Sequence, residues 1–441
     1  MLNTVAVLLT LTAAFSYVNH RYLKWPMTIG VMAIALAVSL VVIGLDQLGF
    51  DMARGQEDSL LASIDFSEVL MQGMLSFLLF AGALHVDFNQ LRKVAWQVGV
   101  FALIGTGLST LLIGFGSWQL LSLLGVPLPL PYCLLFGALI SPTDPIAVLG
   151  LLKSAKVPQS VEATIAGESL VNDGVGVVLF ALMLEMLQTG APPTFGAALA
   201  LFAREALGGA IFGLVVGYLV YRVLRTIDAP QIEILITIAT VVGGYALAHA
   251  LHVSGPLAMV AIGLLIGNAG RALAMSEQTR YRLDMFWQLL DEILNGVLFV
   301  MIGLEFTIIV FPPGSFIAAL PILILCLLVR YLVVGVPTTL GRRWFGLPPR
   351  SGLLLIWSGV RGGISVALAL SLPAGPERNL ILMLTYSVVV FSILVQGLTV
   401  GRLARALGLA KGESSGGGTE SRSGGNDQDR RQGSNHRKRS R

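Results

Sequence analysis

The fold is decided by two polar stretches, Ser141-Pro-Thr-Asp-Pro145 and Gly167-Glu-Ser-Leu-Val-Asn-Asp-Gly174. Both interrupt long runs of Leu, Val, Ile, Ala and Gly, and they bring carboxylates, an amide and hydroxyls into apolar surroundings. A charged side chain near the centre of a bilayer costs about 3 kcal/mol even on the mildest scale. We therefore interpret the cluster as a candidate functional site, which the rest of the chain must position within the membrane.

The remainder of the chain has the composition of an integral membrane protein. Hydrophobic residues make up 55% of the 441 residues and charged residues only 12%, whereas about a quarter of the residues in soluble domains are charged. Helices that cross a bilayer of about 30 Å need roughly twenty apolar residues. We expect thirteen such helices, over the runs 2–19, 26–45, 64–84, 95–122, 130–152, 163–187, 196–224, 231–251, 255–270, 287–306, 313–340, 351–372 and 379–405.

Basic residues predict the orientation of these helices, because Lys and Arg are concentrated in short cytoplasmic loops. The loops between the other runs are poor in Lys and Arg. We therefore expect a multi-pass protein of the cell inner membrane, with the N-terminus outside and the C-terminus in the cytoplasm, which agrees with an odd number of crossings. Basic residues follow every odd-numbered run: Arg21, Lys24, Arg92, Lys93, Lys153, Lys156, Arg222, Arg225, Arg271, Arg280, Arg282, Arg342, Arg343, Arg350, Arg402, Arg405 and Lys411.

Two runs are predicted to contain broken helices. Pro142 and Pro145 interrupt the fifth run, and Ser358-Gly-Val-Arg-Gly-Gly363 interrupts the twelfth. Proline removes a backbone donor, and the peptide groups that a break frees can face a cavity. Thirteen runs also allow two six-helix halves, inverted around the seventh run, in which these two helices correspond. We therefore predict an all-α membrane fold with two inverted six-helix repeats and broken crossing helices 5 and 12.

The chain divides at about residue 410 into a transmembrane region, 1–410, and a basic cytoplasmic tail, 411–441. The tail holds eight Lys and Arg against four Asp and Glu, and this balance of +4 equals the net charge of the whole chain. It has almost no apolar residue, so it cannot bury enough surface to fold and is predicted to be disordered. Its basic end is interpreted either as a contact for anionic lipid headgroups or, more simply, as a solvated tail.

The polar stretches supply oxygen atoms suited to a cation and a carboxylate suited to a proton. Ser169 and Asp173 are four residues apart and therefore share one side of a helix. With Thr143 and Asp144 they can offer oxygen to a small hard cation such as Na⁺. Because desolvation disfavours the charged form of a carboxylate, Asp173 can hold a proton until a cation replaces it. Competition for Asp173, in a site open to one side at a time, is sufficient for exchange without a cofactor.

Arg361 lies in the middle of the twelfth run, where a charged side chain normally pairs with another. Glu168 is the partner that we expect, and this pairing would leave Asp173 free for the ion. A second interpretation of Asp144, Glu168 and Arg361 is a structural network that holds the broken helices together.

Four motifs occur in order along the chain. They are the two stretches quoted first, then Phe299-Val-Met-Ile-Gly-Leu-Glu305 and Trp357-Ser-Gly-Val-Arg-Gly-Gly363. Together they resemble the successive signatures of the monovalent cation:proton antiporter family, which includes bacterial sodium/proton exchangers and their animal relatives. The resemblance spans nearly all of residues 1–405. It implies a homodimer, a dimerisation domain beside a mobile six-helix core domain, and an elevator-like alternating-access cycle that serves pH homeostasis.

The resemblance also implies roles for individual residues. Asp173 carries the ion and the proton, and Glu168 pairs with Arg361. In this family, asparagine immediately before the key aspartate accompanies electroneutral exchange, so Asn172 implies one Na⁺ for one H⁺. The run 64–84 has no acid at the position where some relatives carry one, which puts an auxiliary ion route there in doubt. The residues expected around the Na⁺ ion, beside Asp173, are Asp144, Thr143 and Ser169, with Asn172 as a neighbour.

Two other classes of function stay open on the residues alone. A cation channel or uniporter can use the same acids as a selectivity element and would pass cations without coupled protons. An intramembrane aspartyl protease would use Asp144 and Asp173 as a dyad, but this leaves Arg361 unexplained. Side-chain types barely constrain the choice among Na⁺, Li⁺ and K⁺. No Walker motif follows a predicted strand, which disfavours transport driven by ATP. The expected partners are a monovalent cation, the proton and membrane lipids.

Overall fold

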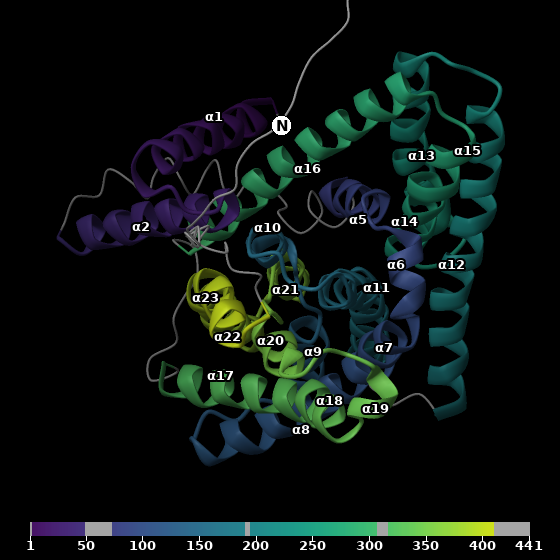
Figure 1. The fold of residues 1–441 in the computed structure, drawn as a ribbon. Helices are drawn as coiled ribbons and strands as arrows, with labels where there is room; N and C mark the ends of the chain where they lie inside the picture. Colours follow the sequence, from purple (N-terminus) through teal and green to yellow (C-terminus); the bar gives the residue numbers. More distant parts are fainter. Residues whose placement is uncertain (1, 49–72, 190–194, 307–315, 410–441) are drawn as a thin grey trace, which may run out of the picture.

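A computed structural model describes residues 2–48, 73–189, 195–306 and 316–409, and this part of the chain is helical without any strand. Short π-helical turns extend several of the helices. The tail predicted over 411–441 lies outside the described residues. The α-helices, labelled as in Figure 1, are α1 (Leu2–Val18), α2 (Met27–Gln47), α5 (Leu75–Leu84), α6 (Phe88–Lys93), α7 (Ala95–Gly99), α8 (Thr106–Leu123), α9 (Leu130–Ile140), α10 (Ile146–Ser154), α11 (Gln159–Thr189), α12 (Phe195–Leu224), α13 (Pro230–Ala250), α14 (Gly255–Leu265), α15 (Arg271–Leu273), α16 (Glu277–Glu305), α17 (Phe316–Arg330), α18 (Val336–Leu340), α19 (Arg342–Phe345), α20 (Ser351–Trp357), α21 (Gly363–Leu370), α22 (Pro376–Phe391) and α23 (Leu398–Ala406).

Eight of the described helical stretches are long and apolar enough to cross a membrane. Three shorter apolar helices accompany them, over 75–84, 130–140 and 255–270. These helices confirm a multi-pass membrane protein, whereas the exact number of crossings, thirteen, stays a prediction.

The two predicted breaks are present. The fifth run ends as α9 at Ile140 and resumes as α10 at Ile146, and the twelfth ends as α20 at Trp357 and resumes as α21 at Gly363. The four half-helices meet near the middle of the molecule beside α11 (Figure 1). Local chemistry explains both interruptions. Pro142 and Pro145 lack the backbone N–H that a continuous helix needs, and Gly359, Gly362 and Gly363 weaken the helix around Arg361.

The other helices surround this centre. In Figure 1, α12 and α13 lie on one side, α8 and α17 lie below, and α1 and α2 lie on the opposite side. The long helix α16 runs across the top and joins these sides, since it contacts α13 as well as α1 and α2. The core is likewise divided, with one buried cluster around α9, α20 and α22 and another around α5, α13 and α14.

Glycine allows α8 and α9 to lie in close contact. A Cβ added to Gly137 would overlap the carbonyl oxygen of Thr110, and one added to Gly114 would come within 2.8 Å of Leu134. Small residues at such crossings let two helix backbones approach. The contact matters for the centre, because α9 ends at the first break.

We predict that Gly137→Ala lowers the free energy of unfolding by about 1–3 kcal/mol, as overpacking of a tight interior does. The measurement is the midpoint of thermal unfolding of the purified protein in detergent. Gly107→Ala on α8 is the matched control, because no heavy atom lies within 4 Å of the added Cβ there. Equal midpoints for the two variants would contradict the close α8–α9 contact.

Candidate functional site

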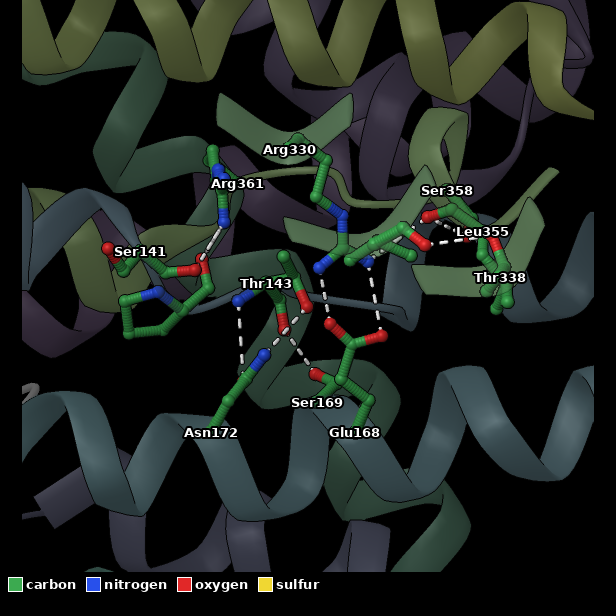
Figure 2. A network of polar contacts seen from close by, with 12 residues as sticks. Ser141, Thr143, Glu168, Ser169, Asn172, Arg330, Thr338, Leu355, Ser358 and Arg361 are labelled. Carbon is green, nitrogen blue, oxygen red and sulfur yellow. Dashed lines mark hydrogen bonds and ion pairs between the residues drawn. The ribbon is translucent and has the colours of Figure 1, made fainter. Parts of the chain in front are cut away.

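The two unwound segments cross and bond to each other. The backbone N–H of Asp144, in the first break, donates to the carbonyl of Val360, in the second, over 2.7 Å. Arg361 extends this contact, because its Nη1 donates to the carbonyls of Ser141 and Pro142, the latter at 2.9 Å (Figure 2). The last carbonyls of a helix have no intrahelical partner and carry partial negative charge. The Arg361 guanidinium, which is 4% exposed, therefore satisfies the end of α9.

Asp144 occupies the complementary position at the start of two half-helices. Its Oδ1 accepts a hydrogen bond of 2.9 Å from the backbone N–H of Ile146, at the first residue of α10. Its carboxylate also lies against Gly362, where an added Cβ would overlap it, immediately before α21. Helix N-termini favour negative charge. The point where the two breaks cross thus places the Asp144 carboxylate at two positive helix ends and the Arg361 guanidinium at a negative helix end.

Helix α11 holds the first break through one of its faces. Asn172 donates from Nδ2 to the hydroxyl of Thr143 over 3.0 Å and accepts from the Thr143 backbone N–H over 3.3 Å. The Ser169 hydroxyl donates to the Thr143 carbonyl (Figure 2). Pro142 lies against Gly176, where a side chain would overlap the proline ring. Because these α11 residues are spaced by three and four, they share a face, as the sequence predicts.

Asp173 is the carboxylate in this arrangement without a hydrogen-bonding partner. It lies next to Asn172 on α11 and is 9% exposed. Within the described residues, no N–H or O–H donates to its carboxylate, and no hydrogen bond joins it to Asp144, as the dyad of an aspartyl protease would require. Among the acids of this arrangement, Asp173 is therefore the one whose carboxylate oxygens accept no hydrogen bond from the described residues.

The predicted ion pair between Glu168 and Arg361 is wrong. Both carboxylate oxygens of Glu168 pair with Arg330 of α17, and the Nη2–Oε2 distance is 3.1 Å (Figure 2). Arg330 also donates from Nη2 to the carbonyl of Leu355 over 3.0 Å. The reason is that the break positions Arg361 at the carbonyls of Ser141 and Pro142, so a different arginine neutralises Glu168. Both residues are buried, Glu168 at 2% exposed and Arg361 at 4%.

Arg330 is the residue that sequence reasoning missed. It is the one charged residue in the stretch 316–340, which otherwise consists of apolar residues, proline, glycine and threonine. Its side chain is 8% exposed. The rule that selected Arg361, that a charge deep in an apolar run must be paired, applies to it equally. A count of the charged residues inside apolar runs of the sequence would have shown two possible arginine partners for Glu168, namely Arg330 and Arg361.

Comparisons with known proteins agree on one family. The family described as "Sodium/hydrogen exchanger, transmembrane" matches residues 7–406. The Na(+)/H(+) antiporter NhaP of Pseudomonas aeruginosa is 51% identical over 411 residues, which cover 92% of this chain and 97% of that protein. The Na(+)/H(+) antiporter NhaH of Halobacillus aidingensis is 36% identical, over 86% of this chain and 92% of its own length.

Among solved structures, the sodium proton antiporter MjNhaP1 of Methanocaldococcus jannaschii has a similar fold. The two chains align with a TM-score of 0.70 at 20% sequence identity, and the alignment covers 93% of this chain and 99% of that one. This likeness confirms the all-helical fold.

We predict that Arg330→Met lowers the free energy of unfolding by about 3–5 kcal/mol, because it leaves the Glu168 carboxylate buried without a counter-charge. The double variant Arg330→Met, Glu168→Leu should recover most of that loss, since no isolated charge remains. Thermal unfolding of the purified variants measures both effects, and Arg282→Met, at an exposed arginine on α16, is the control. A double variant as unstable as Arg330→Met alone would contradict this assignment.

Proposed function

The chain belongs to the family of transmembrane sodium/hydrogen exchangers, and from this premise we propose that it is a secondary antiporter that exchanges Na⁺ for H⁺. The observation that carries the proposal is the state of Asp173, a carboxylate withdrawn from water and without a hydrogen-bonding partner among the described residues. Asp173 follows Ser169 by one turn of α11, and the Ser169 hydroxyl donates to the Thr143 carbonyl. Oxygen atoms of this kind bind hard cations.

The pairing of the other charges supports exchange of one ion for one proton. Glu168 is neutralised by Arg330, and Arg361 lies at the carbonyl end of α9 while Asp144 lies at two helix starts. Asp173 is then the one carboxylate of the site that can exchange a bound proton for Na⁺. If one Na⁺ displaces one H⁺ from it, no net charge crosses the membrane, so we propose an electroneutral cycle.

We further propose that the crossing moves as a unit in an elevator-like cycle. The two breaks and α11 are joined to one another by the Asp144–Val360 and Asn172–Thr143 hydrogen bonds, which favours movement of the whole site over separate movement of its parts. We also propose a homodimer, because the sequence resembles the cation:proton antiporter family. The positions of Lys and Arg further favour a location in the inner membrane with the C-terminus in the cytoplasm.

The experiment uses purified protein in liposomes with an internal pH dye. NaCl, LiCl and KCl are added in turn, with and without a clamped membrane potential. We expect a pH change triggered by Na⁺ that does not depend on the potential. A cation current without proton movement would favour a channel or uniporter, and an absence of any response would refute antiport of these cations.

We predict that Asp173→Asn abolishes the cation-dependent pH change, because an amide cannot exchange a proton for a cation. Its thermal unfolding should stay cooperative, with a midpoint near that of the wild-type protein. Asp87→Asn is the control, since Asp87 is an exposed N-cap of α6 and asparagine caps a helix equally well. An active Asp173→Asn protein would refute the role of Asp173.

Competition for a single carboxylate also predicts the pH dependence. When protons occupy Asp173, each unit of acidification should raise the half-saturating Na⁺ concentration about tenfold, since proton and cation binding are reciprocally linked. Saturating Na⁺ should overcome the inhibition by protons. Sodium titrations of the initial rate at several pH values measure this, and a half-saturating concentration that does not change with pH would contradict competition.

A further inference from the structure

A second group of oxygen atoms lies where α13 and α16 begin. Asp228 precedes α13, and Glu233 lies in the first turn of that helix, while Ser276 is the N-cap of α16 and Thr279 lies in its first turn. The Ser276 hydroxyl donates to Asp228 Oδ1 over 2.7 Å. The Thr279 hydroxyl lies 3.3 Å from the same oxygen and 3.4 Å from Glu233 Oε1. The four side chains therefore form one cluster.

Glu233 is the buried member of this cluster. Its side chain is 0% exposed although it is a carboxylate. Oε1 accepts a hydrogen bond of 3.2 Å from the backbone N–H of Ala229, whereas Oε2 is buried and has no partner among the described residues. A buried polar atom without a partner costs about 1–3 kcal/mol, and more when it is charged. The Oε2 atom therefore indicates a missing ligand.

The charges of the cluster do not balance. Asp228 and Glu233 share the Thr279 hydroxyl, which has one hydrogen and can donate to one carboxylate at a time. Neither carboxylate forms an ion pair with Lys, Arg or His in the part of the chain that the structure describes. The starts of α13 and α16 supply roughly half a positive charge each. About one negative charge is left without compensation.

We propose that Asp228, Glu233, Ser276 and Thr279 form a second cation site, which binds a hard divalent cation such as Ca²⁺. Oxygen atoms make up the whole donor set, as hard cations require, and two carboxylates suit a divalent charge. Asp228 is exposed, so the site opens to solvent and water can complete the coordination shell. The positions of Lys and Arg place this end of the molecule on the cytoplasmic side.

This site is distinct from the one around Asp173. Along α16, Thr279 is separated from Leu298 by 19 residues, or about 28 Å at the rise of an α-helix. Leu298 is the residue of α16 that packs against Gly363, at the start of α21 in the crossing. The proposed cation is therefore a structural or regulatory ligand and is not the transported ion.

The cation would join α13 to α16. Two turns further along α16 from Thr279, Trp287 donates from Nε1 to the Thr237 hydroxyl of α13 over 3.1 Å. Phe80 of α5 packs on the same indole with ring centroids 4.6 Å apart. A cation at the start of both helices would strengthen a contact that α13, α16 and α5 already make, so its binding should stabilise the folded protein.

The test is thermal unfolding of the full-length protein in detergent. CaCl₂ and MgCl₂ are titrated against choline chloride at equal ionic strength, in the wild-type protein and in Asp173→Asn. We expect Ca²⁺ to raise the unfolding midpoint to a plateau in both proteins. Because the measurement reads stability and not transport, its result is independent of the proposed antiport.

The variants Asp228→Asn and Glu233→Gln identify the site. Both should lose the Ca²⁺-dependent rise, and the exposed Asp228 can be replaced without disturbing the interior. Glu277→Gln should retain it, because Glu277 is an exposed acid of the same helix turn outside the cluster. An equal rise in all variants, or no rise with Ca²⁺ or Mg²⁺, would overturn the proposal. A wild-type midpoint that responds to pH alone would also overturn it, since a proton would then balance the charge.

Discussion

The structure depends on the hydrogen-bonded crossing of two interrupted helices. Breaking a helix inside a membrane exposes peptide groups that lipid cannot satisfy, and each such group costs several kcal/mol. Here the two breaks satisfy each other, since the N–H of Asp144 meets the carbonyl of Val360. Arg361 binds the carbonyl end of α9, whereas Asp144 accepts the Ile146 N–H at the start of α10 and lies against Gly362, just before α21. Each charge is thus stabilised by the helix ends that the break created.

The crossing needs a rigid support, and α11 supplies it. Asn172 and Ser169 bind Thr143 from one face of this helix, and Gly176 leaves room for the Pro142 ring. Glu168, immediately before Ser169, is paired with Arg330, which joins α11 to α17. Asp173 lies in the middle of this well-bonded face and is without a hydrogen bond of its own among the described residues. The support therefore keeps Asp173, the carboxylate that we propose exchanges the proton and the cation, in place without competing for its oxygen atoms.

Sequence reasoning reached the parts of this arrangement that local chemistry determines. The breaks follow from Pro142, Pro145 and the glycines around Arg361, and the shared face of α11 follows from residue spacing. The partner of Glu168 could not be found this way, because two buried arginines compete for it from different helices and only the fold decides between them. Residues 228 and 279 likewise meet across 51 positions of the chain, so no local pattern indicates their cluster.

The pairing of charges also explains why exchange of this kind can be coupled. Arg330 pairs with Glu168. Besides Asp173, the two breaks hold one further acid, Asp144, and one further base, Arg361, so the formal charges of these four residues sum to zero. In the proposed cycle, Asp173 with a proton or a Na⁺ ion bound is neutral, and the whole unit could then move past apolar neighbours at low electrostatic cost. With neither bound, it carries one negative charge, and moving that charge through the membrane interior is unfavourable by about 3 kcal/mol or more. In the proposed cycle the empty site is therefore the form least able to move, which would prevent either ion from crossing without the return of the other.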